Sequence, residues 1–199
     1  ITMTRVEDSI EVIANTSGKF MFKDCELKIL NPRSAEGVVR GEQGEVCVKG
    51  WLVMKAYYKM PEETAKALDQ NGWFHTGDLG NLGIDGNLKI TGRYKDMFIT
   101  GGLNVYPAEV ENYLMSHSKI ANVAVVGVPD ERMGEVSMAF IQLKESQNAN
   151  GEEIIEFART TMANYKAPKY VEFVEDLPVT PTGKIKKYLL RDRAIESLG

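Results

Sequence analysis

Residues 72–111 read GWFHTGDLGNLGIDGNLKITGRYKDMFITGGLNVYPAEVE, and their glycines, acids and prolines predict where turns, strands and helices lie. Asp85-Gly86 is a tight-turn dipeptide that predicts a hairpin between strands at residues 79–84 and 87–91. Pro107, followed by two acids, predicts a helix, because proline fits the first helical position and acids favour the positive end of a helix. The stretch therefore joins a β-rich part of the chain to a part that contains helices.

Alternating apolar and polar residues predict two strands upstream of this stretch, at residues 25–30 and 45–49. The polar, glycine-bounded segment 41–44 predicts the turn between them, and Pro61 with its two following acids predicts a short helix. Cys25 stands at an apolar position of the first strand, where we expect it to be buried. The first part of the chain is therefore predicted to be a small, antiparallel, β-barrel-like subdomain.

The pattern changes after Arg93. Two nearly continuous apolar runs, at residues 120–128 and 136–143, are long enough for two buried strands. Asn150 predicts a helix cap, with Glu153 three residues on. The remaining predicted elements are a strand at residues 170–174 and a helix at residues 187–198 whose apolar face carries Leu190, Ala194 and Leu198. The fold class is therefore α+β, with one domain at residues 1–94 and a second, with a small sheet, at residues 95–199.

Composition limits the function classes. The 199 residues are 43% hydrophobic and 26% charged, as in ordinary soluble globular chains, and the net charge of −4 argues against a nucleic-acid partner. The longest apolar stretch is too short for a transmembrane segment, and we find no signal peptide. Two cysteines without a CxxC motif are typical of a reducing, cytoplasmic setting. The chain starts at Ile1, so we expect a processed or excised piece.

A metal site is not expected from the sequence. His75 and His117 lie far apart along the chain, and neither has a cysteine or carboxylate cluster around it in the sequence. We therefore predict no metal-ligating residue in this chain.

Two polar residues of the opening stretch are candidates for binding a ribose. Asp78 ends Thr76-Gly77-Asp78, where glycine allows close approach to a ligand and a carboxylate can accept both ribose hydroxyls. Its structural alternative is a strand-ending turn capped through its own backbone. The guanidinium of Arg93 has donors in a fixed fork that suits ribose and phosphate oxygens. Its alternative is a surface arginine paired with Asp96 or Asp78.

Two loops carry further candidates. Gly101-Gly102 permits positive φ and exposes backbone N–H groups, although an isolated pair of glycines is most often only a loop. Lys184 lies in PVTPTGKIKK at residues 178–187, before the last helix. A lysine on a long stem can reach developing negative charge; its alternative is a solvated lysine at the start of a basic helix. Glu109 and Glu111 are explained by their place in the first helical turn.

Together, GWFHTGDLG, GRYKD, TGGLN and PTGKI resemble the motifs of the adenylate-forming (AMP-binding) superfamily, and the pattern MKAYYKMPEETA at residues 54–65 resembles its acyl-CoA synthetases. The resemblance covers the whole chain as the C-terminal portion of such an enzyme. It implies that Asp78 and Arg93 bind the ribose of ATP and AMP, and that Lys184 drives adenylation. It also implies a hinge at Lys95 for a mobile C-terminal lid, and a coenzyme A tunnel lined by Gly101, Gly102 and Leu103.

The resemblance also shows what to expect beyond these residues. The Asp130-Glu-Arg-Met-Gly-Glu135 turn resembles the DxxxGE turn of the family. Some relatives have a basic residue at the position of Met133, and in this chain the neighbouring Arg132 could take its place. The phosphate-binding loop and the motif that holds adenine and Mg²⁺ are expected upstream of Ile1. The parent enzyme is then expected to use ATP, Mg²⁺, coenzyme A and a small carboxylic acid, in particular a fatty acid, and the isolated chain to be inactive.

Alternatives remain open at this point. The parent could instead load a carrier-protein thiol, or the chain could be a stand-alone, non-catalytic module. A homodimer formed through the missing part, the acyl chain length and acetylation of Lys184 are not decided by the sequence.

Overall fold

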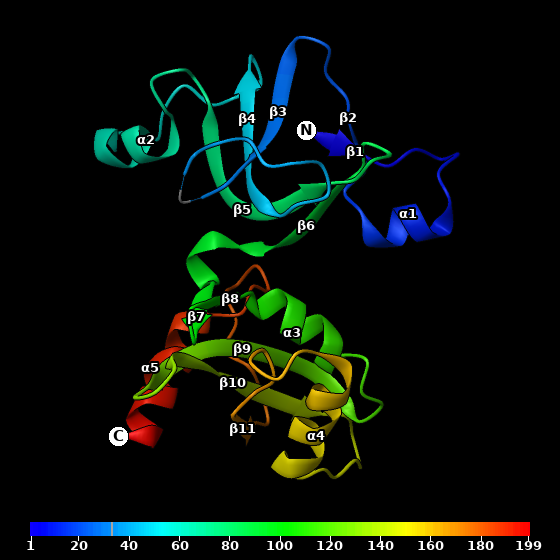
Figure 1. The fold of residues 1–199 in the computed structure, drawn as a ribbon, viewed down its shortest axis with the longest axis vertical. Helices are drawn as coiled ribbons and strands as arrows, with labels where there is room; N and C mark the ends of the chain where they lie inside the picture. The colour runs from blue at the N-terminus through cyan, green and yellow to red at the C-terminus, as the bar shows by residue number, and fades with distance from the viewer. Residues whose placement is uncertain (33) are drawn as a thin grey trace. The chain divides into compact units, whose positions relative to one another are not determined.

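The computed structural model describes residues 1–32 and 34–199, and its fold is α+β, as the sequence predicts. The chain divides into two compact units, Ile1–Lys95 and Asp96–Gly199, and each contains its own sheet (Figure 1). In the described part of the chain, no helix has the length and apolar character needed to cross a membrane.

The first unit is built on a four-stranded antiparallel sheet in the order β3-β4-β5-β6. Its strands are β3 (Cys25–Leu30), β4 (Gly44–Gly50), β5 (Phe74–Leu82) and β6 (Leu88–Arg93). Ile29, Val46 and Leu88 form its buried cluster, and Cys25 is buried as predicted. Within the described residues the sheet is open, with β3 and β6 at its edges, so the barrel-like subdomain expected from the sequence does not close into a barrel.

Shorter elements complete the first unit. The hairpin between β5 and β6 turns at Asp85-Gly86, as predicted. Helix α2 (Pro61–Ala67) begins at the predicted proline and lies between β4 and β5 in sequence. The remaining elements are β1 (Thr2–Met3), α1 (Ile10–Asn15) and β2 (Lys19–Phe20), with β1 and β2 paired. These three were not predicted, because each is too short for its periodicity to be read.

The second unit is built around the antiparallel pair β9 (Ile120–Asp130) and β10 (Gly134–Leu143). Strand β11 (Tyr170–Phe173) pairs in parallel with β10, and the hairpin of β7 (Phe98–Thr100) and β8 (Leu103–Val105) joins the end of β10. The helices are η1 (Tyr94–Asp96, a 3-10 turn at the boundary of the units), α3 (Pro107–Leu114), α4 (Gly151–Thr161) and α5 (Lys187–Leu198). The β7–β8 hairpin is an addition to the predicted elements, because strands of three residues show no periodicity.

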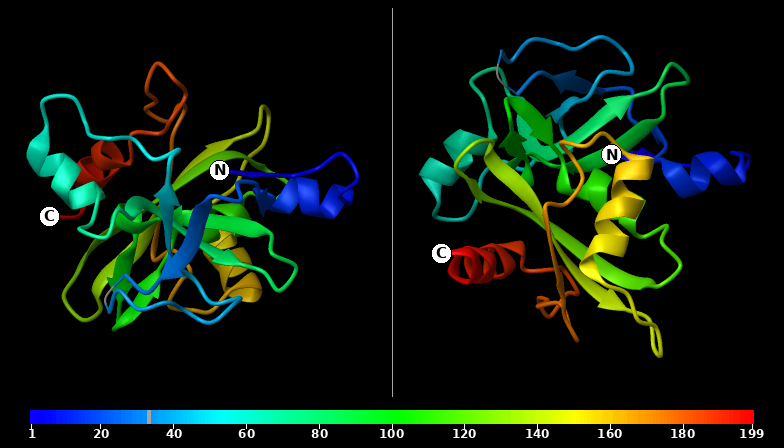
Figure 2. Two further views of the ribbon diagram at one scale, coloured as in Figure 1. Left: turned by 90° about the horizontal axis from the view of Figure 1, so that it is seen from above. Right: turned by 60° about the horizontal axis from the view of Figure 1, so that its bottom comes forward.

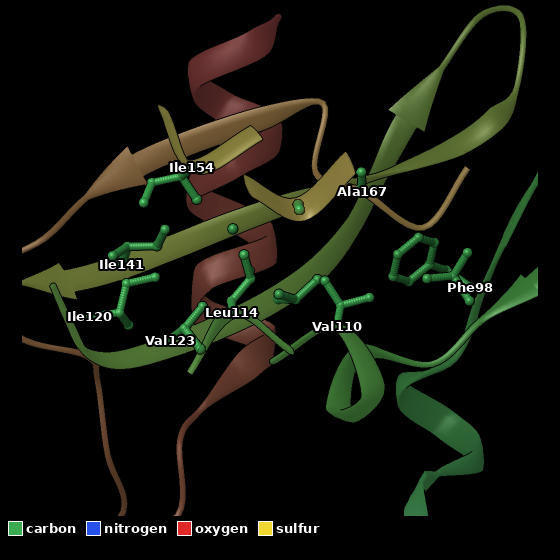
Figure 3. Packing of buried hydrophobic residues seen from close by; sticks show 12 residues of the cluster. Phe98, Val110, Leu114, Ile120, Val123, Ile141, Ile154 and Ala167 are labelled. Carbon is green, nitrogen blue, oxygen red and sulfur yellow. The ribbon is translucent and has the colours of Figure 1, made fainter. Parts of the chain in front are cut away.

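The apolar runs of β9 and β10 are explained by burial on both faces. Alternate residues, such as Val125 and Ile141, pack with α3 and α4 in one cluster, which Figure 3 shows from close by. Their neighbours, such as Val126 and Phe140, pack with α5 in a second cluster. Helices α4 and α5 therefore cover opposite faces of the sheet (Figure 2). Side chains alternate across a strand, so two covered faces require apolar residues at nearly every position.

Helix ends follow the sequence closely in this unit. The Asn150 side chain accepts a hydrogen bond from the Glu153 N–H at 2.9 Å, as the predicted cap requires. In α5, Leu190 and Ala194 are buried against the sheet, but Leu198 is 44% exposed. The predicted apolar face therefore contacts the second cluster through its first two residues, and Leu198, at the end of the helix, lies outside that contact.

Candidate functional site

The candidate ribose-binding turn is a bulge in β5. The pairing of β4 with β5 shifts register between Glu45 and Cys47, where three residues of β5, Thr76, Gly77 and Asp78, stand opposite one residue of β4. Gly77 has a φ of +71°, in the left-handed region that favours glycine. A bulge of this kind turns the strand locally and re-aims the side chains that follow it.

Glu45 fastens this bulge to the sheet. Its Oε1 accepts the backbone N–H of Gly77 at 3.1 Å, and its Oε2 lies 2.8 Å from Nδ1 of His75. The bulge removes the Gly77 N–H from the strand ladder, and a buried backbone donor without a partner is costly. One carboxylate therefore supplies the missing acceptor and also orients the neighbouring imidazole.

Thr76 holds the other side of the bulge. Its hydroxyl donates to the carbonyl of Val46 at 2.7 Å and accepts the N–H of Asp78 at 3.0 Å. Asp78 is also the ladder partner of Arg93, and Oδ1 of Asp78 lies 2.9 Å from Nε of Arg93. The fold thus brings together the two residues that the sequence singled out for a ribose.

The Asp78–Arg93 ion pair also matches the structural alternative for Arg93. The two side chains are 33% and 50% exposed, so solvent screens the pair and it contributes little stability. Within the described residues, Oδ2 of Asp78 and the terminal nitrogens of Arg93 have no hydrogen-bond partner, so both groups remain open to a ligand. The geometry fits ribose binding, because the carboxylate keeps an acceptor and the guanidinium keeps a fork of donors.

Lys95 is exposed and lies in the 3-10 turn η1, and the division between the two compact units falls directly after it. Its ammonium has no ion-pair partner among the residues that the structure describes. Lys95 is therefore distinguished by its place in the backbone at the end of the first unit, and not by a contact of its side chain.

Gly101 and Gly102 form the two-residue turn of the β7–β8 hairpin, between the paired residues Thr100 and Leu103. Their φ values are +57° and +85°, as a turn of this type requires at both central positions. A Cβ on Gly102 would meet nothing within 4 Å. The turn conformation therefore explains both glycines without a ligand. Leu103 is 51% exposed.

The glycine turn is attached to the turn that begins at Asp130. The N–H of Gly101 donates to the carbonyl of Met133 at 2.8 Å. Oδ1 of Asp130 accepts the N–H groups of Arg132 and Met133, and its Oδ2 lies 2.6 Å from Nζ of Lys169. The Lys169 ammonium and the Met133 N–H lower the pKa of Asp130 to about 2. Asp130 thus has a structural role: it shapes the turn on which Gly101 rests.

Lys184 is exposed, on a turn that is itself well ordered by hydrogen bonds. The N–H of Gly183 donates to the carbonyl of Thr180 at 2.9 Å, and Thr180 exchanges further hydrogen bonds with the backbone of Lys184. In the described part of the chain the Lys184 ammonium pairs with no carboxylate. A free cation on a fixed turn is available for an anionic ligand, whereas a buried or paired one would not be.

The two acids of α3 have structural partners, as expected. Glu109 pairs with Lys166 at 2.6 Å. Glu111 accepts the N–H of Val125 at 2.7 Å and pairs with Lys187 at 2.6 Å, which ties α3 to β9 and to the start of α5. Neither acid is available as a general base.

The surroundings of His75 contradict the sequence analysis. The expectation that no cysteine or carboxylate cluster surrounds His75 is wrong: Sγ of Cys47 lies 3.5 Å from its Nδ1, and Oδ2 of Asp69 lies 3.8 Å from its Nε2. Glu45 completes the group. Burial, with the nearby charge of Glu45, raises the pKa of the Cys47 thiol to about 12. Strand pairing brings together residues that lie far apart in the sequence. The one sequence signal for this cluster is that Glu45 and Cys47 are two residues apart in a predicted strand, which places both side chains on the same face.

Residues 109–184 match the AMP-binding enzyme C-terminal domain. The chain belongs to the adenylate-forming (AMP-binding) superfamily and carries this C-terminal domain.

Individual relatives agree with this assignment. The chain is 43% identical over 192 residues to a 3-[(3aS,4S,7aS)-7a-methyl-1,5-dioxo-octahydro-1H-inden-4-yl]propanoyl:CoA ligase of Rhodococcus jostii, covering 96% of this chain and 35% of the relative. It is 45% identical over 174 residues to the mitochondrial medium-chain acyl-CoA ligase ACSF2 of Danio rerio, covering 87% of this chain and 29% of the relative. The chain therefore spans about a third of the length of these relatives.

Solved structures show the same fold. The crystal structure of ATP-bound MatB from Rhodopseudomonas palustris matches with a TM-score of 0.87 and 32% identity, covering 93% of this chain and 37% of that one. The apo crystal structure of MatB matches with a TM-score of 0.68 over the same share of both chains.

Proposed function

We propose that this chain is the C-terminal part of an acyl-CoA synthetase. In the proposed reaction, the carboxylate of an organic acid attacks the α-phosphate of ATP, which gives acyl-AMP and pyrophosphate. The thiol of coenzyme A then attacks the acyl carbon, which releases AMP and a proton and leaves the acyl-coenzyme A thioester. Support comes from the family match and from relatives named as CoA ligases. The relatives' names favour a fatty or similarly apolar acid.

The observation that carries the proposal is the unpaired ammonium of Lys184 on its hydrogen-bonded turn, at the end of the matched domain. In the first half-reaction, negative charge develops between the carboxylate and the α-phosphate. A lysine reaching that position stabilises the transition state more than the ground state. We assign this role to Lys184.

Asp78 and Arg93 are proposed to hold the ribose of the nucleotide. Oδ2 of Asp78 is open to accept hydroxyl hydrogens, and the terminal nitrogens of Arg93 are open to donate. The ion pair between them fixes both side chains before the nucleotide arrives, so less side-chain entropy is lost on binding. Mg²⁺ is expected to accompany ATP, and we assign no residue of this chain to it.

The second half-reaction requires a different arrangement, because Lys184 has no part in thioester formation. We propose that the unit beginning after Lys95 rotates about that residue and brings the Gly101-Gly102 turn, with Leu103, to the path of the coenzyme A thiol. Both cysteines of this chain are free thiols, which fits a reducing compartment such as the cytoplasm.

The test uses the full-length parent enzyme with Lys184→Ala. We expect acyl-AMP formation, measured by pyrophosphate exchange, to fall by about 100-fold to 1000-fold, because one preorganised donor to developing charge is lost. Thioester formation from supplied acyl-AMP should change by only a few-fold. Equal losses in both steps would contradict the assigned role.

Two controls complete the experiment. Lys186→Ala removes a neighbouring ammonium of the same loop that makes no ion pair in the described structure, and it should leave both steps near the unmodified rates. Coenzyme A and a carrier-protein thiol, offered separately to the unmodified enzyme, distinguish the two acceptors. Transfer to the carrier protein alone would overturn the acyl-CoA synthetase assignment.

A further inference from the structure

We propose that Glu45, Cys47 and His75 form a binding site for a thiophilic divalent cation, with Zn²⁺ as the best match. The three side chains present one carboxylate oxygen, one sulfur and one imidazole nitrogen, all within 4.8 Å of one another. No part of the adenylation chemistry uses Cys47 or His75. The site therefore contains none of the proposed catalytic groups, although Glu45 also holds the bulge that carries Asp78.

The strand geometry explains why the three ligands converge. Glu45 and Cys47 are two residues apart on β4, so their side chains project from the same face of the sheet. His75 is the ladder partner of Cys47 on β5, which places the imidazole beside both. Adjacent strands hold these positions through backbone hydrogen bonds, so the ligands are arranged before any metal arrives.

The distance between His75 and Cys47 suits a tetrahedral ion. With metal–ligand bonds of about 2.0–2.3 Å, tetrahedral geometry places ligand atoms roughly 3.3–3.8 Å apart. Nδ1 of His75 lies 3.5 Å from Sγ of Cys47 and 2.8 Å from Oε2 of Glu45. Entry of the ion requires the short contact of His75 with Glu45 to lengthen by about half an ångström, which side-chain rotation alone can provide. Water can occupy the fourth position.

Outer contacts favour the same arrangement. Oδ2 of Asp69 lies 3.8 Å from Nε2 of His75, on the side of the ring away from Cys47. Metal-binding histidines commonly have such a carboxylate at the other ring nitrogen, which fixes the tautomer. Oε1 of Glu45 accepts the Gly77 N–H, which leaves Oε2 for the ion. Zn²⁺ is preferred over Mg²⁺ or Ca²⁺ because two of the three ligands are sulfur and nitrogen.

Binding of the metal ion releases one proton from the site. The Cys47 thiol loses its proton to solvent as the sulfur–metal bond forms, and the imidazole of His75 binds through the lone pair of Nδ1 while its proton resides on Nε2, facing Asp69. The bound ion then sits among one thiolate and two carboxylates, with the Lys28 ammonium, which lies over the ring of Trp73, as the nearby positive charge.

The test titrates the reduced protein with Co²⁺, whose bond to a thiolate gives an intense near-ultraviolet charge-transfer absorption. We expect one equivalent of Co²⁺ per chain, displaced by one equivalent of Zn²⁺ and not by Mg²⁺. Zn²⁺ should also raise the melting temperature, because it binds the folded state only. Absence of the absorption in the unmodified protein, or unchanged absorption in Cys47→Ala, would overturn the proposal.

The chain supplies a matched control in its second cysteine. Cys25 is also a buried thiol on a strand of the same sheet, but it has no place in the ligand cluster. Cys25→Ala should therefore keep the absorption, and Cys47→Ala should lose it. His75→Gln, as a second variant, should weaken Co²⁺ binding by at least about 100-fold while circular dichroism shows a folded chain. Equal loss in the Cys25 and Cys47 variants would indicate adventitious thiol binding and reject the site.

Discussion

At the residue scale, single polar side chains decide the shape of the candidate site. Glu45 is the clearest case, because its two oxygens serve the Gly77 N–H and the His75 ring. Asp130 does the same for the turn that supports Gly101. Neither residue belongs to the groups that the sequence singled out for chemistry. Both act by satisfying backbone groups that irregular strands and turns leave without ladder partners.

Replacing Glu45 by Ala should destabilise the protein by about 1–3 kcal/mol, because the Gly77 N–H and His75 lose their acceptor in a half-buried setting. Denaturant unfolding measures this change. In the parent enzyme, the KM for ATP should rise by about tenfold, which corresponds to about 1.4 kcal/mol. Glu26→Ala, an exposed acid on β3, is the control and should change neither quantity. A stable variant with an unchanged KM for ATP would show that the bulge does not need its carboxylate.

The lowered pKa of Asp130 predicts that the free energy of unfolding depends on pH in the acid range. Its folded-state pKa is about 2, below the ordinary value of 3.8, and its side chain contacts Lys169 and two N–H groups. A lowered pKa means that the folded state stabilises the ionised form, so this contribution is complete above pH 3.8 and is lost as the pH falls toward 2. Asp130→Asn should therefore flatten the decline of unfolding free energy over this window. The measurement is a series of denaturant curves; parallel declines in both proteins would exclude the effect.

At the scale of elements, the β7–β8 hairpin shows how one motif can have two explanations. Gly101-Gly102 is required by backbone conformation in a two-residue turn, before any ligand is considered. The hairpin is then fixed to the turn before β10 by the Met133 carbonyl, and to β10 itself by the pairing of Thr100 with Gly134. Element geometry therefore determines where this turn can present its N–H groups, and its proposed coenzyme A role depends on that placement.

The two glycines should respond differently to Ala. Gly102→Ala places a Cβ in open space at positive φ and should cost about 1–2 kcal/mol. Gly101→Ala should cost more, because its Cβ would lie 2.6 Å from Cε of Met133. Adding Met133→Ala should recover part of the loss for Gly101→Ala and none for Gly102→Ala. Thermal unfolding of the four variants measures these differences, and an equal effect of Met133→Ala on both glycine variants would contradict the contact.

At the scale of the whole molecule, the chain is two units with unequal cores. The unit Asp96–Gly199 has clusters on both faces of its sheet. The unit Ile1–Lys95 has a smaller cluster centred on Ile29, Val46 and Leu88. Buried apolar area is the main source of stability, so the first unit should unfold more easily than the second. Separate transitions are ordinary for two-domain chains.

Two probes can separate these transitions. Both tryptophans, Trp51 and Trp73, belong to the first unit, so their fluorescence reports on that unit, whereas far-ultraviolet circular dichroism reports on both. We expect the fluorescence midpoint to fall at lower denaturant concentration. Ile154→Ala should lower only the later transition, by about 2–5 kcal/mol, because it opens a cavity in the second unit. Coincident curves from the two probes would show that the units unfold together.

Much of the fold follows from local pattern. The strands at β3, β9 and β10, the helix starts at Pro61 and Pro107, and the Asn150 cap are confirmed, because each rests on periodicity or on a capping residue within a few positions. The very short elements and the exposure of Leu198 could not be obtained in this way. They depend on contacts made after the sheet has assembled, and local propensity contains no information about such contacts.

The sequence alone determined the class of fold, because glycine turns, caps and apolar runs are encoded within short windows. The superfamily and the candidate residues came from the resemblance of its short motifs to those of a known family. Only the tertiary structure decided that Asp78 faces Arg93, that Lys184 stands unpaired among the described residues, and that Glu45, Cys47 and His75 share one place. The reason is strand pairing: hydrogen bonds between β4, β5 and β6 join residues that lie far apart along the chain.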